Sequence, residues 1–345
     1  MSLSSPIRSI AGLHAAGLVA EKDLASLAAV ASRYAVAVTP AILKAMDAND
    51  PADPLLRQFI PTAAELNTLP HELMDPISDG AYSPVEGVVH RYPDRVLLKV
   101  VHACPVYCRF CFRREMVGPG GKSLTGAALE AALAYIAAHP AIWEVIFTGG
   151  DPFMLSARRA AAITQRLAAI PHVKVIRWHT RVPVVDPARI TPAFIRAIKA
   201  SGKATYVAIH ANHANEFTAA AEIAIARLAD AGLALVSQTV LLKGVNDDPE
   251  TLTALMRRFV ENRVKPYYLH HPDLAPGTSH FRLSIPEGQR IVQTLRGKLS
   301  GLCQPEYVLD IPGGHGKARL ELSAVDTEAG LIKDYRGKAH PLPKP

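Results

Sequence analysis

The chain has 345 residues, of which 49% are hydrophobic and 20% are charged, and its formal net charge is +7. Only four cysteines are present and no stretch approaches 18 apolar residues, so the composition is that of a globular protein and excludes a disulfide scaffold, and we expect neither an export signal nor a membrane span. The positive charge indicates a mildly basic surface or an anionic ligand rather than nucleic acid, because lysine and arginine do not form runs with interleaved aromatic residues.

The first part of the chain, residues 1–88, has the pattern of a helical region. Helical periodicity over Glu21–Ala35 and Thr39–Met46 alternates with stretches rich in proline and aspartate, such as Asp47–Pro54. We expect this N-terminal helical region to wrap around the core that follows it.

From Arg95 onward, short β-branched runs alternate with helical segments at a spacing of roughly 30 residues. Such alternation predicts a parallel sheet with right-handed crossovers, and six strand–helix units favour a partial (β/α)6 barrel over a closed one. We expect this core over residues 89–301 and a short C-terminal segment over 302–345. The predicted strands are Arg95–Val101, Glu144–Thr148, Val173–His179, Ala204–His210, Leu233–Leu242 and Val264–His270, and the predicted helices are Thr125–Ala138, Ser156–Ala169, Thr191–Ala200, Glu216–Ala231, Pro249–Glu261 and Pro286–Leu299.

The unusual polar residues follow these strands at their carboxyl ends. Because α/β barrels place their sites at that rim, the pattern predicts one functional site built from several loops. The residues concerned are the cysteines after the first strand, Gly149–Asp151 after the second, His179–Arg181 at the end of the third, His210–His213 after the fourth, Gln238 within the fifth and His271–Asp273 after the sixth.

Three of the four cysteines, Cys104, Cys108 and Cys111, lie within eight residues. Three thiolates can hold a 4Fe-4S cluster and leave one iron open to a substrate or cofactor. The alternative is part of a zinc site completed by His102 or Cys303, although structural zinc favours four ligands from paired cysteines. We expect Cys303 to be a buried structural thiol.

Two glycine-rich segments have both a structural and a functional interpretation. Gly149-Gly150-Asp151 forms either a tight turn or a backbone that approaches a ligand closely. Lys317 follows Pro312-Gly313-Gly314-His315-Gly316, which does not match a phosphate loop, and is either a surface lysine or a lysine on a flexible arm that forms a Schiff base.

Charged residues supply the remaining candidates. Arg91, Tyr92 and Arg95 suit a phosphate and a flat ring, although arginines before a strand are commonly solvated. Asp273 and Asp310 follow apolar segments and would together hold an ammonium group; the alternative is a helix N-cap or a surface turn.

Taken together, residues 36–320 resemble the lysine 2,3-aminomutase family of radical S-adenosylmethionine (SAM) enzymes. The matching segments, in order along the chain, are HRYPDRVLLKV, CPVYCRFCFRR, FTGGDP, TRVPVVDPARIT, HANHANE, VSQTVLLKGVND, KPYYLHHPDL, HFR and LDIPGGHGK. The resemblance implies a partial (β/α)6 radical SAM barrel with a helical N-terminal region and a short C-terminal segment that carries a lysine for pyridoxal 5′-phosphate (PLP).

The resemblance also implies a role for each matching residue. Cys104, Cys108 and Cys111 bind the 4Fe-4S cluster, and SAM chelates its open iron. Gly149, Gly150 and Asp151 line the SAM site, with help from His210 and Gln238.

The resemblance implies that Lys317 binds PLP, with Arg91 and Arg95 at the phosphate of PLP and Tyr92 near its ring. The substrate is bound at both ends: Arg113 binds its carboxylate, and Asp273 and Asp310 bind its distal ammonium.

The implied activity is L-lysine 2,3-aminomutase, which interconverts L-α-lysine and L-β-lysine through a radical. One alternative is the branch that makes β-lysine for modifying elongation factor P; a second is a non-catalytic, metal-stabilised binding module. Asp248 stands where clostridial relatives carry a zinc-ligand cysteine, so we expect no structural zinc. We also expect a cytoplasmic homo-oligomer, with L-lysine as substrate and flavodoxin or ferredoxin as electron donor.

Overall fold

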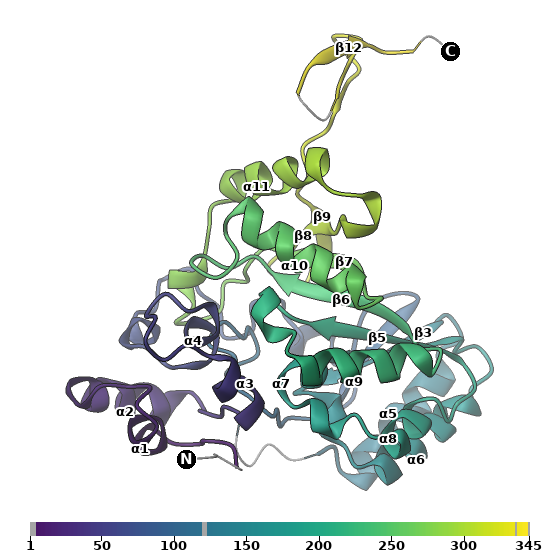
Figure 1. Cartoon of the computed structure of the whole chain (residues 1–345). Coiled ribbons are helices and arrows are strands. Elements are labelled where there is room, and N and C mark those ends of the chain that lie inside the picture. The colour runs from purple at the N-terminus through teal and green to yellow at the C-terminus, as the bar shows by residue number, and fades with distance from the viewer. Residues whose placement is uncertain (1–4, 119–122, 335–336, 344–345) are drawn as a thin grey trace.

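The computed structural model describes residues 5–118, 123–334 and 337–343, and its centre is a nine-stranded sheet in the order β1 to β9 (Figure 1). Strands β2 to β8 pair in parallel, whereas β1 and β9 pair antiparallel at the two edges. The strands are β1 Val88–Tyr92, β2 Arg95–Val101, β3 Glu144–Gly149, β4 Val175–Thr180, β5 Ala204–His210, β6 Ala234–Val240, β7 Lys265–His270, β8 Glu306–Asp310 and β9 Lys317–Arg319.

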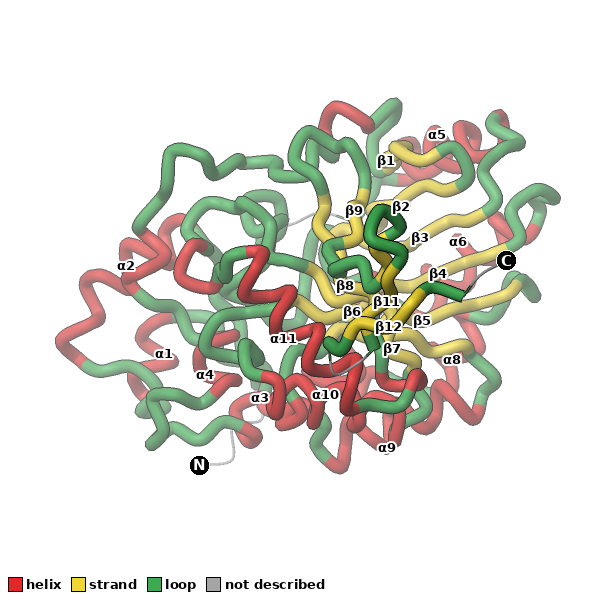
Figure 2. Tube along the Cα trace, turned by 90° about the horizontal axis from the view of Figure 1, so that it is seen from above, coloured by secondary structure: helices red, strands yellow, loops and turns green. Residues whose placement is uncertain are grey.

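Helices alternate with the parallel strands, and Figure 2 shows them along the outer side of the curved sheet. This arrangement confirms the predicted partial barrel. The helices of this part are α5 Gly126–Ala138, α6 Ala157–Ala168, α7 Val182–Val185, α8 Pro192–Ile198, α9 Ala219–Asp230, α10 Pro249–Glu261 and α11 Ile285–Lys298.

The ends of these helices follow from local sequence. Each long crossover helix begins after a residue whose side-chain oxygen accepts a hydrogen bond from the first turn of the backbone. In α10, Pro249 follows the cap directly, where a missing N–H costs nothing. The N-cap residues are Thr125, Ser156, Thr191, Thr218, Asp248 and Ser284.

The N-terminal region contributes short helices that pack against the same core as the sheet. Leu27, Ile42, Leu55 and Phe59 are buried in one apolar cluster with strand residues such as Leu98. Within the described residues, none of the helices has both the length and the apolar character needed to cross a membrane. The helices of this region are α1 Ile10–Ala15, α2 Leu24–Arg33, α3 Pro40–Ala45 and α4 Pro54–Phe59.

The C-terminal segment completes the sheet, which the sequence did not predict. Strand β8 pairs in parallel with β7, so the sheet has a seventh parallel strand where six were expected. Strand β9 then turns back antiparallel to β8. A small separate sheet of β10 Val325–Asp326, β11 Leu331–Lys333 and β12 Ala339–Pro341 projects from the body (Figure 1). The division at residues 88 and 301 stays a prediction.

Candidate active site

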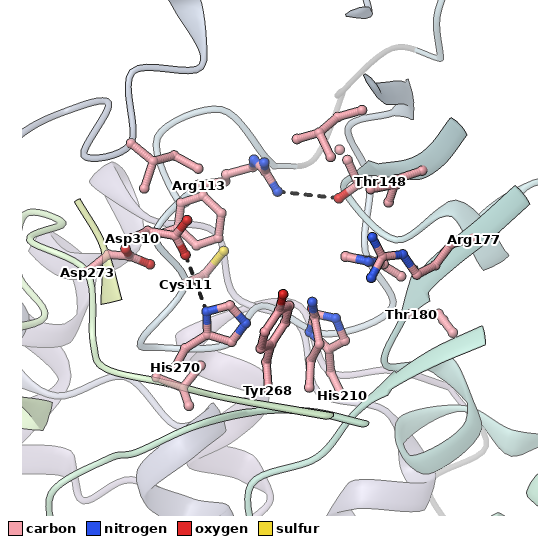
Figure 3. A pocket seen from close by; sticks show the side chains of 18 of the residues that line it. Cys111, Arg113, Thr148, Arg177, Thr180, His210, Tyr268, His270, Asp273 and Asp310 are labelled. Carbon is pink, nitrogen blue, oxygen red and sulfur yellow. Dashed lines mark hydrogen bonds and ion pairs between the residues drawn. The ribbon is translucent and has the colours of Figure 1, made fainter. Parts of the chain in front are cut away.

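A cavity of about 570 Å³ lies inside the curved sheet and reaches the carboxyl ends of its strands (Figure 3). All the site residues predicted from the sequence line it, although they are far apart along the chain. Parallel strands end at one rim of a sheet, and this topology brings most of the residues together, whereas Arg91, Tyr92 and Arg95 lie on β1 and at the start of β2 and line the cavity from that edge. They are Arg91, Tyr92, Arg95, Cys104, Cys108, Cys111, Arg113, Gly149, Gly150, Asp151, His210, Gln238, Asp273, Asp310 and Lys317.

The loop that carries the cysteines, between β2 and α5, is held from behind by the N-terminal region. The backbone amide of Arg109 donates to the carbonyl of Gln58 at 2.8 Å. The fully buried carboxylate of Glu65 binds the guanidinium of Arg109 at 2.5 Å and that of Arg114 as well. The helical region at the start of the chain therefore positions the cysteines.

The thiols of Cys104, Cys108 and Cys111 face the cavity, and burial raises the pKa of each. For Cys108 the pKa rises to about 11, although Arg181 donates a hydrogen bond to its Sγ at 3.4 Å. Thiolates in so buried a place need a bound positive charge, which an iron–sulfur cluster supplies. Across the described ranges, no three His, Cys, Asp or Glu side chains converge on a site for a single metal ion. Three thiols at one cavity match the three protein ligands of a 4Fe-4S cluster that keeps one iron open, whereas structural zinc takes four protein ligands.

Gly149 and Gly150 bring the end of β3 against the backbone that leads to the cysteines. A Cβ atom at Gly150 would lie 2.4 Å from the carbonyl oxygen of Ala103, and one at Gly149 would lie 2.5 Å from that of Val101. Gly149 also has a φ of 114°, which strains other residues. The structure shows a close approach to the cysteine loop, and the predicted approach to a ligand stays a prediction.

This contact gives a first testable prediction. We expect Gly150→Ala to lower the free energy of unfolding by about 1–3 kcal/mol, because the added methyl group overlaps the Ala103 carbonyl and displaces the loop. Urea unfolding and the iron content of the purified protein measure the effect. Gly126→Ala in α5 is the control, since its Cβ would meet nothing within 4 Å. Equal stabilities of the two variants would contradict the interpretation.

Asp151 ties the end of β3 to the end of β4. Its carboxylate accepts hydrogen bonds from the Thr180 hydroxyl at 2.7 Å, the Arg181 amide at 2.7 Å and the Phe153 amide at 3.0 Å. Burial raises its pKa even though these donors favour the charged form. Because the carboxylate is occupied within the protein, Asp151 shapes the cavity wall.

The Arg91–Arg95 segment joins the first edge of the sheet to the last. The Tyr92 hydroxyl accepts a hydrogen bond from the backbone amide of Lys317 at 2.9 Å. The Arg95 guanidinium lies 4.0 Å from the centre of the Tyr92 ring and pairs with Asp94 at 2.8 Å. This contact places the ring and both arginines of the segment beside β9.

Lys317 begins β9 in register with Asp310 of β8, so it does not lie on the free glycine arm that the sequence suggested. Its Nζ lies 2.6 Å from each Asp310 oxygen, and His270 Nδ1 lies 3.3 Å from Oδ2 (Figure 3). Burial by itself would raise the pKa of Asp310, but His270 and Lys317 together hold it well below its usual range. Asp310 is therefore an ionised carboxylate.

Asp273 faces the same end of the cavity from the loop after β7 (Figure 3). Burial raises the pKa of Asp273 most, and the negative charge of Asp310 raises it further, to about 7. No helix begins at Asp273, so the alternative role as an N-cap does not apply. Two carboxylates in one pocket attract a cation.

Several cavity residues were missed because they lie within strands rather than after them. Arg177 on β4 and His270 on β7 both line the cavity, beside His179, which the sequence had placed at the end of its strand. The signal was present, since Arg177 and His179 alternate with apolar neighbours, which is typical of a strand with one polar face. Among the residues that the structure describes, neither Nε2 of His179 nor Nε2 of His210 has a hydrogen-bond partner, and burial lowers both pKa values, that of His210 to about 3. Both rings are therefore neutral.

The amino-acid sequence of this chain is similar to those of known proteins. The model of the radical SAM superfamily matches residues 98–256, which include the three cysteines. The chain is similar to L-lysine 2,3-aminomutase of Clostridium subterminale, with 40% identity over 305 residues, or 88% of this chain and 73% of that protein. Its identity to L-lysine 2,3-aminomutase of Escherichia coli (strain K12) is 37% over 88% of each chain. It is also 33% identical to glutamate 2,3-aminomutase of Clostridioides difficile, over 97% of this chain and 80% of that protein.

These likenesses extend beyond the superfamily core. The radical SAM match ends at residue 256, whereas the similarity to the aminomutases covers most of the chain. The cysteine loop, the curved parallel sheet and the shared cavity are all present in the structure. The chain therefore belongs to the lysine 2,3-aminomutase family of the radical SAM superfamily.

Proposed function

We propose that this protein is an L-lysine 2,3-aminomutase, an isomerase that moves the amino group of L-lysine from Cα to Cβ and yields L-β-lysine. The observation that carries the proposal is the gathering of three thiols, Lys317 and the pair Asp273–Asp310 around one cavity. The carboxylate pair favours lysine over glutamate, because a second carboxylate beside Asp310 would be repelled whereas an ammonium group is attracted.

The cavity offers a separate group of residues to each of three cofactors. When bound, the 4Fe-4S cluster with SAM supplies a carbon-centred radical, and PLP stabilises a radical on the substrate. We assign Cys104, Cys108 and Cys111 to the cluster; Gly149, Gly150, Asp151, His210 and Gln238 to SAM; and Lys317, Arg91, Arg95 and Tyr92 to PLP.

The chain's own residues bind and orient the substrate. The planar guanidinium of Arg113 suits a carboxylate in a bidentate pair. Asp310 is held ionised by its neighbours and can bind the ammonium of Lys317 or that of the substrate in turn, with Asp273 as the second carboxylate. Apolar side chains such as Val96 and Ile146 also line the cavity and exclude water from a reactive radical.

The proposal is tested by incubating the reduced protein anaerobically with SAM, PLP and L-lysine and assaying for β-lysine. We expect β-lysine to form only when all three cofactors are present. Turnover of glutamate without turnover of lysine would overturn the assignment of Asp273 and Asp310. Protein that carries zinc and binds no PLP would instead support the non-catalytic binding module.

The raised pKa of Asp273 predicts a pH dependence of lysine binding. Below about pH 7 Asp273 is protonated in the empty protein, so we expect the affinity for lysine to rise as the pH rises through about 7. Because the pKa of Asp273 is higher in the folded protein than its usual value of 3.8, the protonated side chain adds to the free energy of unfolding at low pH. This contribution is lost as the pH rises through about 7. Lysine titrations between pH 5.5 and 8.5 measure the first effect. Asp273→Asn should flatten the profile, and an unchanged profile in that variant would contradict the prediction.

We further propose that the protein works in a reducing compartment, the cytoplasm, and receives electrons from flavodoxin or ferredoxin. The support is that all four cysteines are free thiols and that three of them face the cavity. Assembly into a homo-oligomer and the absence of nucleic-acid partners stay predictions.

A further inference from the structure

A single buried carboxylate, Asp79, joins two arginines that face the cavity. Its Oδ1 lies 3.3 Å from NH2 of Arg91, and its Oδ2 lies 3.0 Å from Nε and 2.9 Å from NH2 of Arg113. The Asp79 side chain is 0% exposed, whereas the side chains of Arg91 and Arg113 are 10% and 11% exposed. Asp79 does not itself line the cavity, so it acts on the two arginines from behind.

The two arginines come from different parts of the fold and meet at Asp79. Arg91 lies on β1, and Arg113 follows the cysteines. Each also donates a hydrogen bond elsewhere: Arg91 to the carbonyl of Ile77 at 2.5 Å, and Arg113 to the Thr148 hydroxyl at 3.3 Å (Figure 3). Asp79 is the group that these two guanidiniums share.

Asp79 is itself fixed and charged. Its backbone amide donates to Asp75 Oδ1 at 2.9 Å, and the amide of Gly80 donates to Oδ2 at 2.8 Å, so Asp75 holds the turn. Burial by itself would raise the pKa of Asp79, but the positive charges of Arg113, Lys99 and Arg91 hold it below its usual range. Without this anion, three neighbouring cations would repel one another in a buried place.

We propose that Asp79 is a positioning residue that sets the spacing between an arginine for the cofactor phosphate and an arginine for the substrate carboxylate. The inference rests on the proposed function, because that function is what assigns the phosphate to Arg91 and the substrate carboxylate to Arg113. It follows that one substitution outside the cavity weakens the binding of both ligands, and that the loss is confined to their anionic groups.

The test compares ligands with and without those groups on the reconstituted holoprotein. In Asp79→Asn we expect the Kd of PLP and the KM of L-lysine each to rise about tenfold, since a hydrogen bond to a charged group is worth roughly that factor. The Kd of pyridoxal, which lacks the phosphate, and the inhibition constant of L-lysinamide, which lacks the carboxylate, should change by less than about twofold. Asp79→Glu keeps the charge and should recover part of both losses.

Glu72→Gln provides the matched control. Glu72 is also a fully buried carboxylate and binds Arg282 at 2.5 Å, but neither residue lines the cavity. We expect it to lower stability and to leave the ratio of PLP to pyridoxal affinity unchanged. If it shifts that ratio as much as Asp79→Asn does, the inference is overturned. If Asp79→Asn does not fold, Asp79→Glu carries the same comparison, because its extra methylene group displaces both guanidiniums.

The possible outcomes separate this inference from the proposed function. Wild-type affinity for PLP and lysine in Asp79→Asn would overturn the inference, as would tighter binding, which would mean that Asp79 only neutralises the arginines. Wild-type protein that binds PLP and lysine but forms no β-lysine would overturn the proposed reaction and leave the inference supported by the binding ratios. Wild-type protein that binds neither ligand would overturn both.

Discussion

The variant Cys108→Ala should contain no 4Fe-4S cluster and form no measurable β-lysine. Two remaining thiolates, Cys104 and Cys111, leave a second iron without a protein ligand, and the guanidinium of Arg181 loses the sulfur to which it donates. Without the cluster no electron reaches SAM, so the loss of activity is complete rather than partial. Anaerobic purification followed by iron and sulfide analysis, visible absorbance and the β-lysine assay measure the result.

Cys303→Ala is the control for this variant. Cys303 is 7% exposed, packs in the main apolar core and does not line the cavity. We expect Cys303→Ala to keep its iron and its activity and to lose only stability, because a small buried side chain has been shortened. If Cys108→Ala keeps a full complement of iron, or if the wild-type protein carries a single zinc ion, the assignment of the three cysteines is wrong.

The second large effect is expected for Lys317→Ala. On the proposed assignment Lys317 is the residue that holds PLP covalently, so we expect lysine turnover to fall by at least about a thousandfold, because the cofactor loses its fixed orientation. Borohydride reduction followed by mass spectrometry should find the PLP mass on the Lys317 peptide of the wild-type protein and on no peptide of the variant. Asp310 also loses an ion-pair partner at 2.6 Å, so the stability of the cofactor-free variant should fall as well.

Lys333→Ala on β11 is a suitable control, because Lys333 is exposed and does not line the cavity. It should retain both the PLP adduct on Lys317 and full turnover. An adduct on a different lysine in the wild-type protein, or wild-type turnover in Lys317→Ala, would show that another residue binds the cofactor.

Local signals in the sequence were sufficient for most elements of the core. Strand β5 and helix α10 have the predicted limits, Ala204–His210 and Pro249–Glu261. In α10 an N-cap aspartate and a proline mark the start, and buried apolar residues recur at helical spacing, so nothing distant is needed to define it. Strands β8 and β9 escaped prediction because they are only five and three residues long and form through pairing with β7 and with each other.

By itself the sequence determined the cysteine trio, the candidate lysine and the rim on which the site lies. A motif and a strand–helix alternation involve residues that are close together along the chain, so they can be recognised without the structure. Only the tertiary structure decided what these residues contact. It brought Asp79 behind two arginines, set Lys317 against Asp310 and His270, and placed Gly150 against the cysteine loop. Those partners are brought together by the register of the sheet and by the connections between its strands. A local pattern of charge or hydrophobicity cannot predict such pairings.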